Sequence, residues 1–508
     1  MPSTFVSFLL LVIGAEIHTS TAVINPSANL KTANQWNLIS YNFPYGLNTN
    51  DPEVYNPMNI VATGVAVAYD RLFIATPKLF SGVTATISTI RKDLAGDSPV
   101  LEVYPDWSFH RPGRQNVTCN DLLLISVYRL KIDSCNRLWV LDAGISRSLE
   151  DFEKTCPPKI LVFDLNTNQV VRRIDFPPEV LRGESLFTNL IIDETSSKPG
   201  GNCDDVFVYI SDTVEPGIVV YDSIRDMTWR VSHPAMFPDP DFAQSDIQGY
   251  KFVLMDGVVG ITFDNQDLIY FQPLATDRLF SVSKQVLRAG PIPLNQLLPV
   301  KLVGKKSSQG IGLAVAPDRS IVFAPMTETA IASYNPYTNE QSILAYDPER
   351  LQFIGDMQIS RFNPNELYLV SSRFHRFFLK NLDGNDINTR ILKIDLPNYS
   401  PPQQHAYTPS YNHQYTGLTL PNFPYFPLNS NSIDRHSTNE VFQSLRQPFP
   451  YEPVGLKGPK SPFQALNQGE LFPNSKKPNQ KLGFGNSYHG HNRVRFAKSI
   501  PNNQTAIV

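Results

Sequence analysis

A short pattern recurs six times along this chain, and this repeat limits the possible folds more than any other feature. Each copy is a polar turn followed by a run rich in Val, Ile, Leu, Phe and Tyr, residues that suit a buried strand. The copies are YDRLFIA (69–75), CNRLWVL (135–141), CDDVFVYI (203–210), NQDLIYF (265–271), PDRSIVFA (317–324) and NPNELYLV (363–370). A similar apolar segment precedes each turn, so each copy is expected to contain a β-hairpin.

A further hairpin follows several copies, which raises the unit to about four strands. The segments KILVFDLNTNQVVRRI (159–174), GIVVYDSIRDMTWRV (217–231) and AIASYNPYTNEQSIL (330–344) each place a turn between two apolar runs. Four strands per unit are typical of a propeller blade, and helical periodicity is almost absent between the copies. We predict an all-β fold, a six-bladed β-propeller over residues 30–396, with the ring closed near 36–70 and 365–395. A series of β-sandwich domains is the alternative.

The two ends of the chain differ from this repeated region. Residues 1–22 contain an apolar run (5–13) that is too short to span a bilayer and is typical of a signal peptide, cleaved after Ala15 or after Ala22. Residues 397–508 are basic and rich in Pro, Asn and Gln, which predicts a mostly disordered tail that either contacts cuticle or extracellular matrix or has no specific partner. We therefore expect a secreted protein with no membrane span.

The four cysteines imply two disulfides in an oxidising compartment. In a blade, the loop before the first strand and the loop after the second strand share one face, and the turn between these strands lies on the other face. Because bridged Cα atoms must lie within about 7 Å, this topology predicts Cys119–Cys156 and Cys135–Cys203. Three sequons predict glycosylation, at Asn116, Asn398 and Asn503. The net charge of −3 gives no reason to expect a nucleic-acid partner.

Several longer segments resemble one known family, and they do so in the same order along the chain. They are YPDWSF, RLWVLDAG, CPPKILVFDLNTNQVVRRIDFP, NCDDVFVYISD, FPDPDF and LIYFQPLATDRLFSVSKQVLR. Over about residues 36–395 the chain resembles the yellow / major royal jelly protein family of insects. The resemblance implies a secreted six-bladed propeller. It also implies chemistry of aromatic amines or catechols outside the cell: cuticle melanin pigmentation, dopachrome conversion, or amine binding in the central channel.

A ligand site is expected at the propeller channel, on the face where the inner strands begin. The candidate residues there are Asp142, Phe187, Thr188, Asn189, Thr327 and Asp356. A carboxylate can hold a protonated amine, and an aromatic ring adds cation–π attraction. For Asp142, which follows a strand and precedes Gly144, closing the strand is the favoured role. Asp356 and Asn189 lie on predicted inner strands and carry more weight.

Three functions are compatible with these residues. We favour a non-catalytic protein that acts in pigmentation or binds a small aromatic amine or catechol. The second is an isomerase or tautomerase for dopachrome-like substrates, with an inner-strand acid as proton shuttle. The third is a metal-dependent, lactonase-like hydrolase with Asp356 and Asn189 among its ligands. We expect no metal or other cofactor, because His110, His233 and His375 lack metal-ligand spacing. No catalytic residue is assigned from the sequence.

Overall fold

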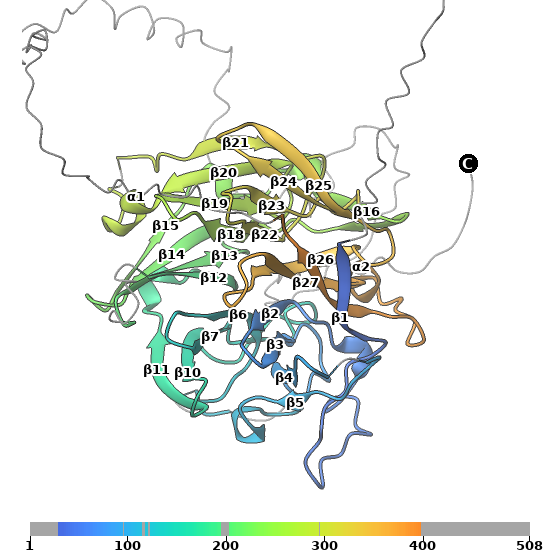
Figure 1. Ribbon diagram of the computed structural model, residues 1–508. Coiled ribbons are helices and arrows are strands. Elements are labelled where there is room, and N and C mark those ends of the chain that lie inside the picture. Colours follow the sequence, from blue (N-terminus) through green and yellow to red (C-terminus); the bar gives the residue numbers. More distant parts are fainter. Residues whose placement is uncertain are drawn as a thin grey trace, which may run out of the picture. The chain divides into compact units, whose positions relative to one another are not determined.

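The structure is a computed structural model that describes residues 29–397, except 95, 114–116, 120–121, 195–202 and 294. Within these residues, six four-stranded antiparallel sheets are arranged as the blades of a propeller (Figure 1). This confirms the predicted all-β, six-bladed fold. The predicted signal peptide, the tail after Pro397 and the sequons at Asn116, Asn398 and Asn503 lie outside the described residues.

The strands of each blade are given from the inner strand to the outer one. Blade 1 contains β2 (Gly64–Val67), β3 (Arg71–Ala75), β4 (Ile87–Arg91) and β5 (Glu102–Val103). Blade 2 contains β6 (Val127–Ile132), β7 (Arg137–Asp142), β10 (Lys159–Asp164) and β11 (Gln169–Asp175). Blade 3 contains β12 (Phe187–Glu194), β13 (Val206–Asp212), β14 (Gly217–Asp222) and β15 (Met227–Val231).

Blade 4 contains β18 (Val258–Phe263), β19 (Leu268–Pro273), β20 (Arg278–Ser283) and β21 (Lys301–Lys305). Blade 5 contains β22 (Leu313–Val315), β23 (Ile321–Phe323), β24 (Ala330–Asn335) and β25 (Glu340–Tyr346). Blade 6 contains β26 (Phe353–Ile359), β27 (Glu366–Ser372), β28 (Thr389–Asp395) and β1 (Leu30–Trp36). The six recurring apolar runs of the sequence are thus the second strands of the blades.

Smaller elements lie in the connections between these strands. Two hairpins are added, β8 (Ile145–Ser146) with β9 (Glu153–Lys154), and β16 (Gln244–Ile247) with β17 (Tyr250–Val253). Two short helices are α1 (Lys284–Arg288) and α2 (Phe374–Phe378). Five single 3₁₀ turns are η1 (Pro57–Asn59), η2 (Trp107–Phe109), η3 (Pro178–Val180), η4 (Pro234–Met236) and η5 (Pro240–Phe242). Among the described residues, no helix has the length and apolar character needed to cross a bilayer.

An aspartate holds the polar turn that precedes the second strand. Asp133 accepts hydrogen bonds from the backbone N–H of Cys135 at 3.0 Å and of Arg137 at 2.9 Å. Its other oxygen accepts the indole N–H of Trp139 at 2.8 Å. Asp264 bonds two backbone N–H groups and a buried aromatic side chain in the same way in blade 4. The repeated polar residues of the sequence therefore fix the hairpin turns.

The inner strands contact each other in chain order around the axis, and β26 of the last blade contacts β2 of the first. The ring is closed by β1, which pairs antiparallel with β28 and forms the outer strand of blade 6 (Figure 1). The closure was predicted near residues 36–70, but the closing strand spans Leu30–Trp36 and so lies almost entirely ahead of that range. The last blade therefore contains strands from both ends of the described chain.

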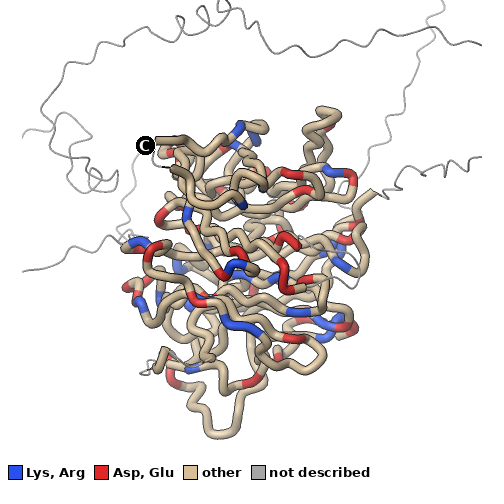
Figure 2. Tube along the Cα trace, turned by 90° about the vertical axis from the view of Figure 1, so that its left-hand side faces the viewer, with Lys and Arg blue, Asp and Glu red and all other residues tan. Residues whose placement is uncertain are grey.

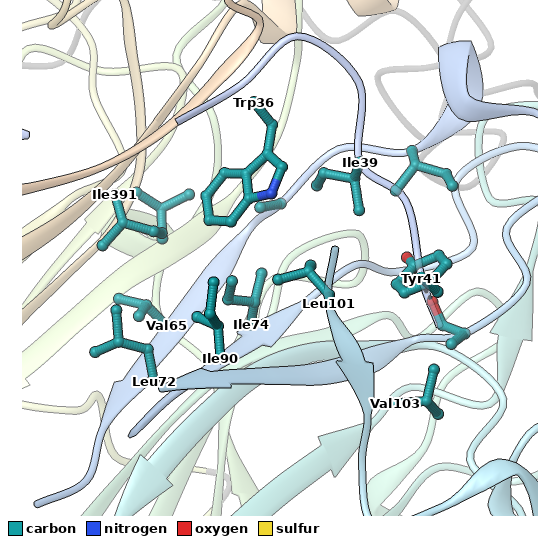
Figure 3. Close-up of a cluster of buried hydrophobic side chains, with 14 of the residues drawn as sticks. Trp36, Ile39, Tyr41, Val65, Leu72, Ile74, Ile90, Leu101, Val103 and Ile391 are labelled. Atoms are coloured by element: carbon teal, nitrogen blue, oxygen red, sulfur yellow. Dashed lines mark hydrogen bonds between the residues drawn. The ribbon is translucent and has the colours of Figure 1, made fainter. Parts of the chain in front are cut away.

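The hydrophobic core lies between the blades rather than at one centre. One cluster packs blade 6 against blade 1, with Trp36 of β1 and Ile391 of β28 facing Val65, Leu72 and strands nearby (Figure 3). All of these side chains are buried. Other clusters join blade 1 to 2, 2 to 3, 3 to 4, 4 to 5 and 5 to 6. Each blade is thus covered on its faces by its neighbours, which explains why its strands are apolar on both sides.

Both predicted disulfides are present. Cys119 is bonded to Cys156 with their Cα atoms 5.4 Å apart, and Cys135 to Cys203 with a separation of 6.1 Å. The first lies within blade 2 and the second joins the β6–β7 turn of blade 2 to the β12–β13 turn of blade 3. This confirms the pairing deduced from blade topology.

Charged side chains of both signs are interspersed over the blades in Figure 2. Several are paired, such as Lys393 with Glu366 between strands at 2.9 Å and Arg350 with Asp347 within a turn at 2.7 Å. Such partly exposed pairs contribute little to stability. The face seen in Figure 2 therefore offers no large field of one sign to steer a charged macromolecule.

Candidate functional site

Four of the inner strands contain a register shift near their start. The shifts fall between Val127 and Arg129, Phe187 and Asn189, Val258 and Gly260, and Ile354 and Asp356. A bulge of this kind re-aims the side chains that follow it. All four bulges lie toward the face on which the inner strands begin, which is called the top face below.

Asp356, a predicted ligand residue of β26, lies at one of these bulges and is buried. Its carboxylate accepts the N–H of Val65 at 3.2 Å. The Arg129 guanidinium and the Lys131 ammonium of blade 2 each lie 3.8 Å from it. Two cations and a backbone N–H thus already compensate this acid, and it links blades 6, 1 and 2. A further cation is disfavoured here by repulsion from Arg129 and Lys131.

Asn189 and Thr188, predicted on β12, also bond within the protein. The Asn189 amide donates to the carbonyl of Val259 in blade 4 at 3.0 Å, and its oxygen accepts the N–H of Leu190 at 2.9 Å. The Thr188 hydroxyl bonds that of Thr213. Both side chains are buried. Asn189 joins blade 3 to blade 4 directly, and Thr188 does so through Thr213, whose hydroxyl donates to the carbonyl of Val258 at 3.0 Å.

Asp142 closes the strand β7, as favoured from the sequence. Its carboxylate is fully buried, accepts the N–H of Ser126 at 2.8 Å and of Gly144 at 3.0 Å, and lies 2.7 Å from the Lys159 ammonium. Burial opposes ionisation, but Lys159 and the backbone donors outweigh it and lower the pKa of Asp142. Gly144 has φ of +69°, and a Cβ there would lie 2.0 Å from the carbonyl oxygen of Cys156. The Asp142 to Gly144 turn is therefore structural.

Two predicted residues lie elsewhere. Phe187 is in the core between blades 2 and 3, where its ring meets that of Phe176 edge-on at 4.9 Å. It does not reach the axis, because it precedes the β12 bulge. Thr327 follows β23 on the top face and is exposed, with its N–H donating to the Ser308 hydroxyl at 3.2 Å. The structure thus brings Asn189, Thr188 and Asp356 to inner-strand bulges and separates Phe187 and Thr327 from them.

Asp256, which was not among the residues predicted from the sequence, is an acid without such compensation. It lies in the loop ahead of β18 on the top face and is partly buried. Among the described residues, its carboxylate has no hydrogen-bond or ion-pair partner. Burial raises the pKa of Asp256 to about 6. The carboxyl group therefore changes its charge close to neutral pH.

Tyr128 is a polar aromatic side chain whose ionisation is affected by the charge of Asp256. It is the second residue of β6, and its hydroxyl lies 2.8 Å from the Ser148 hydroxyl. Burial raises the pKa of Tyr128 well above its usual range, and the negative charge of Asp256 contributes in the same direction. The phenol therefore stays protonated and can donate a hydrogen bond.

Helix α2 adds aromatic surface to the same region. Phe377 and Phe374 pack in one hydrophobic cluster with Tyr128. The Phe377 ring lies 5.0 Å from that of Phe80, and the Phe374 ring stacks on that of Phe353 at 4.5 Å. We call Asp256, Tyr128, Ser148, Phe374 and Phe377 the central site.

The central site combines an acid, a phenol and aromatic rings. An ionised Asp256 can hold an ammonium group, and aromatic rings such as Phe374 and Phe377 attract cations through their faces. An acid whose pKa lies near 6 can also accept and return a proton. Among the described residues, no group of three or more His, Cys, Asp or Glu side chains is placed to hold a metal ion.

Little in the sequence pointed to Asp256 or to helix α2. Asp256 precedes Gly257 and the inner strand β18, in the kind of loop expected on the top face. Its lack of a partner depends on residues distant in the chain. Helix α2 has five residues and is too short for a helical period to be recognised.

Comparisons with known proteins identify relatives of this chain. The family model of the major royal jelly proteins matches residues 125–402. The dopaminechrome tautomerase of Drosophila melanogaster is 28% identical over 358 residues, which cover 67% of this chain and 75% of that protein. Protein yellow of Drosophila yakuba is 30% identical over 402 residues, which cover 74% and 71%.

Among solved structures, virginiamycin B lyase from Staphylococcus aureus is 10% identical, with a TM-score of 0.35 over 62% of this chain and 79% of that chain. This likeness is too low to carry an argument. The family match covers more than half of the 508 residues, and the yellow relative is similar over most of its length. The chain therefore belongs to the yellow / major royal jelly protein family of insects.

Proposed function

We propose that this is a secreted, yellow-type protein that binds a small aromatic amine or catechol at the central site and acts in the melanin pathway of cuticle pigmentation. Family membership supports the pathway. The observation that carries the site is Asp256, an acid without a partner among the described residues. Its charge affects the ionisation of Tyr128, and Tyr128 packs in one hydrophobic cluster with Phe374 and Phe377 of α2. Secretion, glycosylation and contact of the tail with matrix are parts of this proposal that rest on the sequence.

The main ligand contact proposed here is Asp256, not Asp142 or Asp356, the acids predicted from the sequence. Asp142 is neutralised by Lys159, and Asp356 lies between Arg129 and Lys131. Asp256 has no such cation, so a ligand ammonium would supply the missing charge. Thr188, Asn189 and Thr327 are left as secondary ligand contacts on the top face.

Tautomerisation of an aminochrome is the second candidate function. Such a reaction removes a proton from one atom of the substrate and returns a proton to another, with no net change in composition. A single carboxyl group can do both when its pKa lies near the working pH, and the pKa of Asp256 is about 6. The similarity to a protein named dopaminechrome tautomerase favours this candidate.

The metal-dependent hydrolase does not fit the residues it would need. Its expected ligands were Asp356 and Asn189. The Arg129 and Lys131 cations, each 3.8 Å from Asp356, would repel a metal ion at that position. The Asn189 amide oxygen is already bonded to the N–H of Leu190.

The test compares wild type with Asp256→Asn, which removes the charge and keeps the shape. Calorimetric titration with dopamine, serotonin and histamine measures binding, and loss of dopaminechrome absorbance measures turnover. We expect saturable binding in wild type that weakens at least about tenfold in the variant, because a charge-assisted contact is lost. The exposed acid Asp241 gives a matched control, Asp241→Asn, which should bind as wild type does.

The turnover arm separates the two candidates. Dopaminechrome conversion by wild type that disappears in Asp256→Asn would identify a tautomerase. Binding without conversion would identify a binding protein. Equal amine affinity and equal turnover in wild type and Asp256→Asn would show that the central site is not used.

A further inference from the structure

A second candidate site is a cavity of about 310 Å³, which is bordered by α2, the β16–β17 hairpin and the segment that precedes β26. The hairpin contributes Gln248 and Tyr250, and the segment contributes Glu349. Helix α2 contributes Arg376, and Arg373 immediately precedes this helix. The helix also contacts β17 directly. Cavities that hold small molecules typically begin at about this volume.

Three arginines and two acids form one network of ion pairs at the wall of this cavity. Glu349 lies 2.7 Å from Arg373 and 3.0 Å from Arg390. Asp386 pairs with Arg373 as well and lies 2.9 Å from Arg376. Each acid is thus shared by two arginines, and the network of three cations and two anions carries one net positive charge.

The imidazole of His375, which also lines the cavity, is affected by this positive charge. Burial is the main reason why the pKa of His375 falls to about 4, and the charges of Arg376 and Arg373 lower it further. His375 is therefore neutral at physiological pH and adds no charge to the network. The same arginine charges that disfavour a protonated imidazole favour an anion in the cavity.

Arg376 retains donors with which to bind such an anion. Its side chain is 22% exposed and lines the cavity. Its guanidinium donates one hydrogen bond to Asp386 and one to the Tyr250 hydroxyl, each at 2.9 Å. A guanidinium has five N–H donors, so three remain without a partner among the described residues. The Tyr250 hydroxyl accepts the bond from Arg376 and keeps its own proton for donation to a ligand.

We propose that this cavity binds a small organic anion through a carboxylate or phosphate group. The anion would neutralise the net positive charge and accept hydrogen bonds from Arg376 and Tyr250. Arginine suits this role because its planar guanidinium matches the spacing of two oxygens in a carboxylate or phosphate. Glu349, the acid of the wall, is bonded by two arginines, which offsets its repulsion of an anion.

The test uses the full chain, titrated calorimetrically with sodium phosphate and with sodium succinate at constant ionic strength. Succinamide, which resembles succinate in shape but carries no charge, is the control ligand. We expect one or both anions to bind wild type saturably and succinamide not to bind. The anion that binds more tightly shows whether the site takes a phosphate or a carboxylate group.

Three variants change the affinity in different directions. Arg376→Gln removes the charge and most of the donors, and it should weaken anion binding about tenfold or more. Tyr250→Phe keeps the ring and removes the hydroxyl, and it should weaken binding about threefold. Glu349→Gln removes an acid from the wall, so it should strengthen binding about threefold. A merely structural role of these side chains would not give opposite effects.

Two controls make the result specific. The Arg319 guanidinium lies over the Tyr337 ring at 4.6 Å, much as that of Arg376 lies over Tyr250 at 4.7 Å, but Arg319 is exposed in a turn of blade 5. Arg319→Gln should therefore leave affinity unchanged. Asp256→Asn should also leave it unchanged, so that failure of the central site and failure of this one are distinguishable. Absence of saturable binding of both anions to wild type, equal binding of succinate and succinamide, or wild-type affinity in both Arg376→Gln and Glu349→Gln would overturn the proposal.

Discussion

Three aspartates on the top face have different roles because the charged and hydrogen-bonding groups around their carboxylates differ. Asp142 is enclosed by backbone donors and Lys159, and Asp356 by Arg129 and Lys131. Asp256 has no comparable partner among the described residues, and burial alone raises its pKa to about 6. The first two acids are therefore part of the framework, and the third is available to a ligand or a proton.

Breaking the Asp142–Lys159 pair should destabilise the propeller strongly. Asp142→Asn leaves the Lys159 charge buried without compensation, and loss of one partner of a buried ion pair costs about 3–5 kcal/mol. Urea unfolding at pH 7 measures this difference. The exposed acid of the Arg91–Asp93 pair provides the control Asp93→Asn, which should unfold at the wild-type urea concentration.

The same pair predicts an acid-dependent loss of stability. The folded state lowers the pKa of Asp142, so its contribution is complete above the unfolded value of about 4 and is lost as pH falls through the folded value. The difference in unfolding free energy between wild type and Asp142→Asn should therefore shrink from pH 7 to pH 2. A constant difference over this range would contradict the ionic role of Asp142.

The residues that sequence reasoning placed correctly are those whose role is local. Asp142 was favoured as the end of a strand because a glycine follows two residues later, and this is what the structure shows. Phe187 was misplaced because the bulge after it shifts the register, and a shift of one residue turns a side chain to the other face. Asp256 was missed because its lack of partners depends on distant segments.

Among the elements that the sequence did not reveal, β1 closes the ring and α2 contributes to the central site. The strand β1, LKTANQW, lacks an alternating apolar pattern and buries mainly Leu30, Asn34 and Trp36. Its conformation depends on pairing with β28, which is far away in the chain. The second strands were recognised because each is apolar on both faces and follows a turn fixed by polar residues.

The closing strand gives a prediction at this scale. Trp36 is buried between blades 6 and 1 (Figure 3). Its indole N–H donates to the carbonyl of Pro99 at 2.7 Å. Trp36→Ala should cost about 3–5 kcal/mol of unfolding free energy, measured in urea, because it opens a cavity in the seam. The control Tyr45→Ala removes a fully exposed aromatic ring and should have little effect. Equal stability of both variants would mean that β1 does not hold the ring closed.

At the scale of the whole propeller, the ring places six inner strands around one axis and gathers their preceding loops on one face. This geometry brings Asp256, from the loop before blade 4, close enough to Tyr128 of blade 2 to affect its ionisation, and it packs Tyr128 against α2 of blade 6. The repeat in the sequence predicted the ring, and the disulfide between blades 2 and 3 followed from its topology. The residues of the central site could not be predicted from the repeat, because they come from three different blades.

The central claim is that ionised Asp256 holds the ammonium group of a small aromatic amine. Calorimetric titration with dopamine from pH 5 to pH 7.5 tests it most directly, because an alkyl ammonium stays charged throughout this range. Affinity in wild type should rise with pH through a single ionisation near 6, as the carboxyl group loses its proton. Affinity in Asp256→Asn should be weak and independent of pH. A flat profile in wild type, or the same rise in the variant, would contradict the account.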